Sequence, residues 1–181
     1  ALDAVWREGQ LYATATIDPE GACSPDPALA GTTKAYWVRM DATGGPGTIF
    51  LADSGIIDGE DIAPDTTTFF PAIGVNRLNE MVVGFSASAP TIYAGAFAAG
   101  RGIADGAGMI GPTQTVKAGE DYYLRTFGGT RNRWGDYSGI ALDPSNEKFF
   151  WVFNMYAAPR AEEPSSSGED GRWGTAWGRV K

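Results

Sequence analysis

Residues 70–86 read FPAIGVNRLNEMVVGFS, and residues 137–153 read YSGIALDPSNEKFFWVF. Each stretch has a short apolar run, a polar turn and a second apolar run, which is the pattern of a β-hairpin. The second stretch repeats the first at a constant offset, as Ile73 and Ile140 illustrate. The other aligned pairs are Asn76 with Asp143, Asn79 with Asn146, and Glu80 with Glu147. A repeat at a fixed spacing predicts a fold built from similar units.

A fainter third copy lies near the start of the chain, where residues 2–16 read LDAVWREGQLYATAT. It aligns Val5, Gly9 and Leu11 with Val75, Asn79 and Met81. Each hairpin is followed by a third predicted strand: AYWVRM (35–40), TIYAGAFA (91–98) and WGTAWGRV (173–180). A fourth follows in the first two units, TIFLAD (48–53) and TQTVKAG (113–119). The sequence therefore predicts four-stranded antiparallel units.

The second strand of each later hairpin is apolar on both faces. Met81, Val83 and Phe85 alternate with Val82 and Gly84, and residues 149–155 follow the same pattern. A strand of this kind must be covered on both sides. We therefore predict an all-β chain forming one partial β-propeller domain over residues 1–181, with blades at about 1–57, 66–120 and 134–181. The last blade lacks its fourth strand. Because three blades do not close a ring, the remaining blades are expected from the parent chain or from another chain. The alternative is a β-sandwich of about ten strands.

The amino-acid composition of this chain argues against long helices and against several classes of partner and catalytic site. Its 25 glycines and 11 prolines leave no room for a long helical pattern. The net charge of −8 disfavours nucleic acid as a partner, and no apolar stretch approaches the ~20 residues that a membrane span needs. Histidine is absent, which excludes Ser-His-Asp and Cys-His catalysis. The single Cys23 has no intrachain partner.

Several stretches resemble one protein family. They are RTFGGTRNRWGDYSGIALDP (125–144), FWVFNMYA (150–157), RWGTAWGRV (172–180), GEDIAPDTTTFFPAIGVN (59–76) and GFSASAPTIYAGAF (84–97). They resemble bacterial secreted sialidase-like, or exo-α-sialidase-like, β-propellers. The resemblance implies C-terminal blades of a longer propeller and a secreted or cell-surface location. The Asp-box turn of true sialidases, S-x-D-x-G-x-x-W, does not occur in this sequence.

The candidate site is the segment from Arg131 to Tyr137. Arg131 and Arg133 would bind a carboxylate or sulfate of a ligand, and Trp134 would stack on a sugar ring. If the protein is an enzyme, Asp136 and Tyr137 are its catalytic pair, with the carboxylate polarising the phenol. Three upstream residues would extend the same surface, Tyr122, Tyr123 and Arg125, although DYYLRTF (121–127) also fits a strand that packs. The alternative interpretation is structural: Asp136 pairs with an arginine, and Trp134 packs between blades.

A second candidate is the acidic loop ADSGIIDGEDIAPD (52–65). Asp58, Glu60 and Asp61, with Asp53 and Asp65 near them, are hard oxygen ligands of the kind that calcium prefers. The alternative is a solvated acidic loop. No cofactor is required by any motif in the chain.

Three functions follow from these features. The leading one is a non-catalytic module that binds an extracellular polymer, such as a glycan, or a protein. The second is a sialidase-like glycoside hydrolase or related polysaccharide-active enzyme. The third is a structural subunit of a multi-chain surface assembly.

Overall fold

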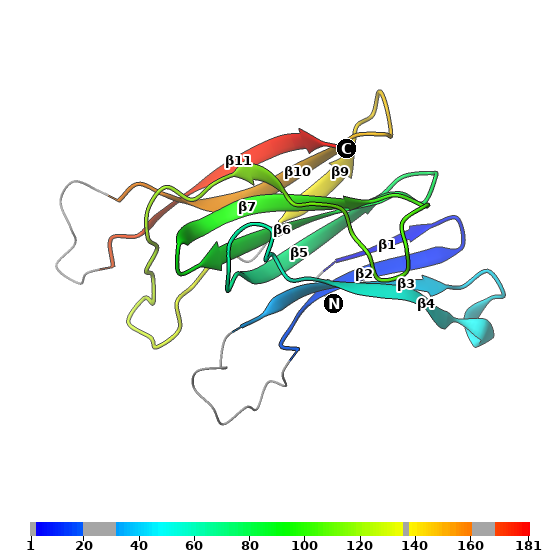
Figure 1. The fold of residues 1–181 in the computed structure, drawn as a ribbon, viewed down its shortest axis with the longest axis horizontal. Helices are drawn as coiled ribbons and strands as arrows, with labels where there is room; N and C mark the ends of the chain where they lie inside the picture. Colours follow the sequence, from blue (N-terminus) through cyan, green and yellow to red (C-terminus); the bar gives the residue numbers. More distant parts are fainter. Residues whose placement is uncertain (1–2, 20–31, 136–137, 161–168) are drawn as a thin grey trace.

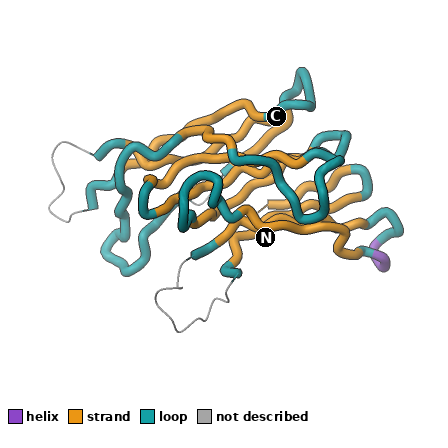
Figure 2. The backbone as a smooth tube through the Cα atoms, viewed as in Figure 1, coloured by secondary structure: helices purple, strands orange, loops and turns teal. Residues whose placement is uncertain are grey.

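The computed structural model describes residues 3–19, 32–135, 138–160 and 169–181. Cys23, Asp136 and Tyr137 lie outside these ranges. The described part is all-β, with a single short 3₁₀ turn at Pro46–Thr48 and no α-helix (Figure 2). It has no helix long and apolar enough to cross a membrane.

The strands form three antiparallel sheets, each ordered as in the sequence. The first sheet holds β1 (Asp3–Arg7), β2 (Gln10–Ile17), β3 (Lys34–Asp41) and β4 (Phe50–Ile57). The middle sheet holds β5 (Thr67–Val75), β6 (Met81–Ala89), β7 (Ile92–Arg101) and β8 (Gln114–Lys117). The last sheet holds β9 (Gly139–Leu142), β10 (Phe150–Ala158) and β11 (Arg172–Val180). The predicted hairpins and the predicted third and fourth strands are all present. The predicted bounds of the fourth strand of the first unit are wrong, because β4 runs on to Ile57 and takes Asp53 out of the predicted acidic loop.

The middle sheet lies between the other two (Figure 1). Val83 and Phe85 of β6 join a core with Tyr12 and Trp37 of the first sheet. Val82, from the opposite face of β6, joins a second core shared with the last sheet. The first seven residues of β6 are buried. The prediction that this strand is covered on both faces is confirmed.

The registers refine the sequence repeat. Val75 pairs with Met81 at the end of one hairpin, and Leu142 pairs with Phe150 at the end of the other. The later turn is therefore two residues longer than the middle one. As a result, the offset that relates the first strands of the two hairpins is shorter by two than the offset that relates their second strands.

In the first unit the turn is one residue shorter than in the middle unit, since Trp6 pairs with Leu11. Val5 therefore does not occupy the place of Val75. It packs from the first sheet against the core that contains Val75, whereas Trp6 is the residue that corresponds to Val75. The predicted match of Leu11 with Met81 holds, and the match of Val5 is wrong by one position.

Among the described residues, two ion pairs link the sheets. Arg101 of β7 and Asp53 of β4 lie 2.7 Å apart, with side chains only 8% and 4% exposed. Arg7 of the first hairpin pairs with Glu147 in the hairpin turn of the last sheet at 2.8 Å. The Glu147 carboxylate also accepts a hydrogen bond from the backbone N–H of Arg77, in the turn of the middle hairpin. The three hairpin turns therefore meet at Glu147.

Candidate functional site

The segment 123–135 folds back on itself between β8 and β9. The backbone N–H of Arg133 donates to the carbonyl of Arg125 at 2.7 Å, and the Asn132 side chain bonds both the N–H of Arg125 and the carbonyl of Tyr123. Phe127 and Gly128 form the tip with positive φ angles of 52° and 79°. The segment is thus an ordered hairpin-like loop.

The residues just before β11 hold this loop in place. The Glu169 carboxylate accepts hydrogen bonds from the Thr126 hydroxyl and from the N–H of Phe127. The Thr126 hydroxyl is the main cause that lowers the pKa of Glu169. Arg125 donates through Nε to the carbonyl of Gly171 at 2.7 Å. This bond ties Arg125, predicted to bind ligand, to the residue before β11 and gives it a structural contact.

Trp134 lies where the segment meets the middle sheet. Its Nε1 donates to Ser86 Oγ at 3.1 Å, and its ring packs edge-on against Phe69 and Tyr123. Burial raises the pKa of the Tyr123 phenol above its ordinary value. The contacts of Trp134 match the structural interpretation, yet the residue is only partly buried and its ring lines two cavities.

The larger of these, the aromatic cavity, has a volume of about 340 Å³ and opens between the segment and the outer face of the last sheet. Its lining residues are Tyr123, Phe127, Arg133, Trp134, Gly135, Phe153, Met155, Trp173 and Thr175. Sequence reasoning found Tyr123, Arg133 and Trp134 but missed the residues from β10 and β11. Alternation along those strands shows which residues share a face, but it does not show that residues 123–135 fold over that face.

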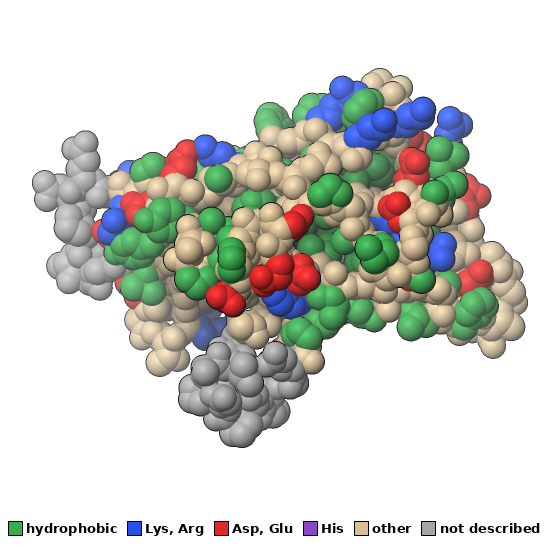
Figure 3. Space-filling model, viewed as in Figure 1, with side chains coloured by type: hydrophobic (Ala, Val, Ile, Leu, Met, Phe, Trp, Pro, Cys, Tyr) green, Lys and Arg blue, Asp and Glu red, His purple; other side chains and the backbone are tan. Residues whose placement is uncertain are grey.

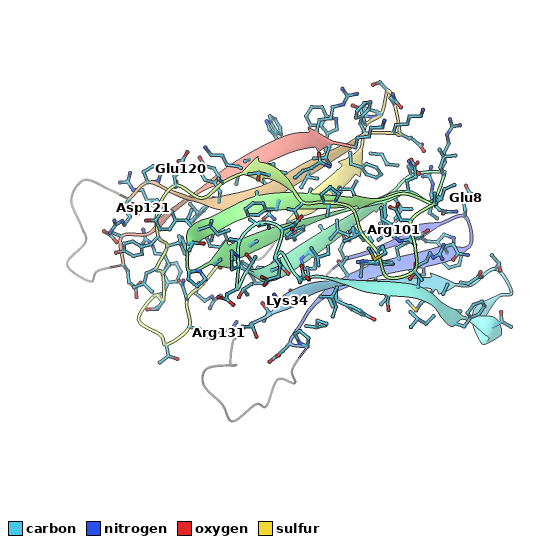
Figure 4. All side chains as sticks on the ribbon, in the orientation of Figure 1. Glu8, Lys34, Arg101, Glu120, Asp121 and Arg131 are labelled. Carbon is cyan, nitrogen blue, oxygen red and sulfur yellow. The ribbon has the colours of Figure 1, made fainter. Side chains whose placement is uncertain are left out.

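The arginine cavity lies on the other side of Trp134 and has a volume of about 300 Å³. Arg131, Asn132 and Arg133 line it with Phe70, and Arg131 lies on the loop that follows β8, near the lower edge of the middle sheet (Figure 4). Arg131 and Arg133 are exposed, and neither forms an ion pair with a described residue. The structure therefore brings Arg131, Arg133 and Trp134 together, with Tyr123 beside them.

The acidic loop after β4 shows a different arrangement. Acidic side chains gather in front of the middle sheet in this region (Figure 3). Asp61 accepts two hydrogen bonds from Thr113. Glu60 Oε1 lies 3.8 Å from Lys34 Nζ, and the Asp58 carboxylate accepts a hydrogen bond from the backbone N–H of Glu60. No three acidic or cysteine residues of the described ranges are grouped as a metal site. Calcium binding by Asp58, Glu60 and Asp61 stays a prediction.

Comparison with known proteins gives no relative: no family model, no curated protein and no solved structure matches this chain.

Proposed function

We propose that this chain is a non-catalytic glycan-binding part of a bacterial extracellular or cell-surface β-propeller, and that it binds sugar in the aromatic cavity. The observation that carries this proposal is the lining of the cavity. Five of the lining residues are aromatic, and one is an arginine. Ligand sites are typically concave and apolar, with a few polar groups that fix orientation.

The chemistry of a sugar ring suits this lining. The C–H face of a pyranose is apolar and packs on the face of an aromatic ring, while its hydroxyl or carboxylate groups bind a guanidinium. Phe127, Trp173 and Phe153 are respectively 76%, 58% and 44% exposed. Arg133 lines both cavities, so it can contact a charged substituent of a ligand whose ring lies in the aromatic cavity.

Two features support a propeller over a two-layer sandwich. The sheets stack in chain order, so the middle sheet is covered on both faces. Their first strands β1, β5 and β9 are neighbours in turn, and their hairpin turns meet at Glu147. Blades that radiate from one axis have both properties.

The test is binding on a glycan array, followed by calorimetry on any hit. Trp173→Ala should weaken binding about five- to 150-fold, because stacking of a ligand ring on an aromatic side chain contributes roughly 1–3 kcal/mol where it has been measured for nucleobases. Phe50→Ala is the matched control, since Phe50 is 60% exposed but lies on β4 of the first sheet, away from the cavity. Unchanged binding after Trp173→Ala, with an unchanged melting temperature, would show that the cavity is not the site.

A sialidase-like hydrolase is the second candidate. Arg131 and Arg133 line one cavity without an ion-pair partner among the described residues, and such a pair suits the carboxylate of an acidic sugar. Turnover of a fluorogenic sialoside that Tyr137→Phe and Asp136→Asn abolish would establish it. A folded protein without turnover on a panel of glycosides would exclude it.

A further inference from the structure

The outer face of the last sheet, on the side away from the middle sheet, carries four exposed aromatic residues. Trp151 and Phe153 of β10 are 41% and 44% exposed, and Trp173 and Trp177 of β11 are 58% and 77% exposed. We call these four residues the aromatic face. Monomeric proteins rarely leave so large an apolar patch without a partner.

The first sheet has a corresponding face. Residues 37–39 of β3 read Trp-Val-Arg, and residues 177–179 of β11 read Trp-Gly-Arg. Arg39 pairs with Tyr12 across the ladder as Arg179 pairs with Trp151. Each sheet therefore presents a tryptophan, an arginine and a further aromatic residue at matching positions. In the first sheet this side faces the middle sheet, and in the last sheet it faces away from the middle sheet.

In the first sheet this face is covered. Tyr12 and Trp37 are each 1% exposed, because the middle sheet packs over them. The contact is made mainly through β5, which lies against β1, β2 and β3 and contributes Ile73 and Val75 to the shared core. The interface between the first and middle sheets thus shows what such a face binds. It packs against the apolar face of another sheet, mainly through the first strand of that sheet.

The middle sheet shows that the ladder itself does not require these large residues. At the same places it has Gly84 paired with Ala98, and Val82 paired with Gly100. These small residues let the last sheet approach closely, since a Cβ on Gly84 would lie 2.6 Å from Val152 Cγ1. Large aromatic residues at these positions are therefore specific to the first and last sheets.

The chain also carries an uncovered surface of the kind that this face binds. The outer face of the first sheet has Trp6 on β1, 59% exposed, at the position that Val75 holds on β5. The half-buried Leu11 and Ala15 continue it on β2, next to β1, on either side of the buried Ala13. We propose that the aromatic face of one chain docks on the outer face of the first sheet of a second copy, head to tail.

The area and the chemistry fit this occupant. With aromatic side chains of about 150–250 Å² each, covering four that are 41–77% exposed would bury roughly 450 Å² on one side. That falls a little short of the ~500 Å² per partner that a specific interface needs, so exposed neighbours on the same side of β11, such as Thr175, would have to supply the rest. Arg179, on the same side of β11, is held by Asp143 at 3.0 Å and stacks on Phe149, so its charge is already paired where the second copy would dock. Two copies, each of three sheets, would close a ring of six, within the four to eight blades that propellers use.

The first experiment measures mass in solution by light scattering over a range of concentrations, without any glycan. Wild type should have the mass of two chains. Trp177→Asp should have the mass of one, with an unchanged circular dichroism spectrum. Phe127→Asp is the control, because Phe127 is 76% exposed, much as Trp177 is, but lies at the tip of the 123–135 loop. It should keep the mass of two chains, although it alters the aromatic cavity.

The second experiment tests the head-to-tail arrangement. Trp6→Asp should also give single chains, whereas an equal mixture of Trp6→Asp and Trp177→Asp retains one intact contact and should recover a species of two chains. Wild type that stays a single chain at every concentration would overturn the proposal. A Trp6→Asp variant that keeps the mass of two chains would also overturn it, because the contact would then join two aromatic faces. Phe153 and Trp173 also line the aromatic cavity, so a second copy and a glycan would compete for them. Light scattering without glycan tests the contact between copies, and the glycan array tests the cavity, so either proposal can fail alone.

Discussion

Gly84→Ala should destabilise the protein by about 1–2 kcal/mol, although glycine is normally the weaker residue within a strand. A Cβ at this position would lie 2.6 Å from Val152 Cγ1, well inside van der Waals contact. Valine is stiff about χ1 and its methyl cannot turn away. Overpacking of this kind costs about 1–3 kcal/mol, and the backbone gain of alanine over glycine, ~0.5–1 kcal/mol, offsets only part of it.

Urea unfolding, followed by circular dichroism, gives the free energy that this prediction concerns. Gly139→Ala is the control, because no described atom lies within 4 Å of its added Cβ, so it should be neutral or slightly stabilising. In a Val152→Ala background the same Gly84→Ala change should lose its cost, since the methyl that it meets is gone. A cost below about 0.5 kcal/mol in the wild-type background, or no coupling to Val152, would refute the close approach of the middle and last sheets.

Two further outcomes follow from the ionic contacts. Asp53→Asn should lower the free energy of unfolding in urea by about 3–5 kcal/mol, because it leaves the buried Arg101 guanidinium without its counter-charge. The double change Asp53→Leu with Arg101→Met should cost much less. Equal costs would show that the ion pair is unimportant. Arg160 holds the pKa of Asp121 at about 2, below its usual 3.8, through a direct hydrogen bond. A lowered carboxyl pKa stabilises the fold above the unfolded value, and this contribution is lost as the pH falls from about 4 through 2. In an NMR titration Arg160→Gln should return the pKa of Asp121 toward 3.8, and an unchanged value would remove Arg160 as the cause.

The candidate site was predictable only in part. Arg131, Arg133 and Trp134 stand close in the sequence, and a segment that the repeat does not explain was a sound signal for them. Phe153 and Trp173 were not predictable as their neighbours, because that requires the 123–135 loop to fold over the last sheet, held by Glu169 and Gly171. The repeat of Trp37-Val-Arg39 in Trp177-Gly-Arg179 was visible in the sequence, but one copy is buried and the other exposed.

The sequence by itself determined the all-β class, the hairpins and the strand order, because apolar alternation and turn residues act over short distances along the chain. It also determined that β6 is covered on both faces, since Val82 and Val83 point to opposite sides of one strand. Only the tertiary structure decided which sheet covers which, how a turn longer by two residues shifts the repeat, and which aromatic residues remain exposed. Those features depend on contacts between residues far apart in the chain, where the same Trp-x-Arg pattern becomes core beneath a neighbouring sheet and open surface without one.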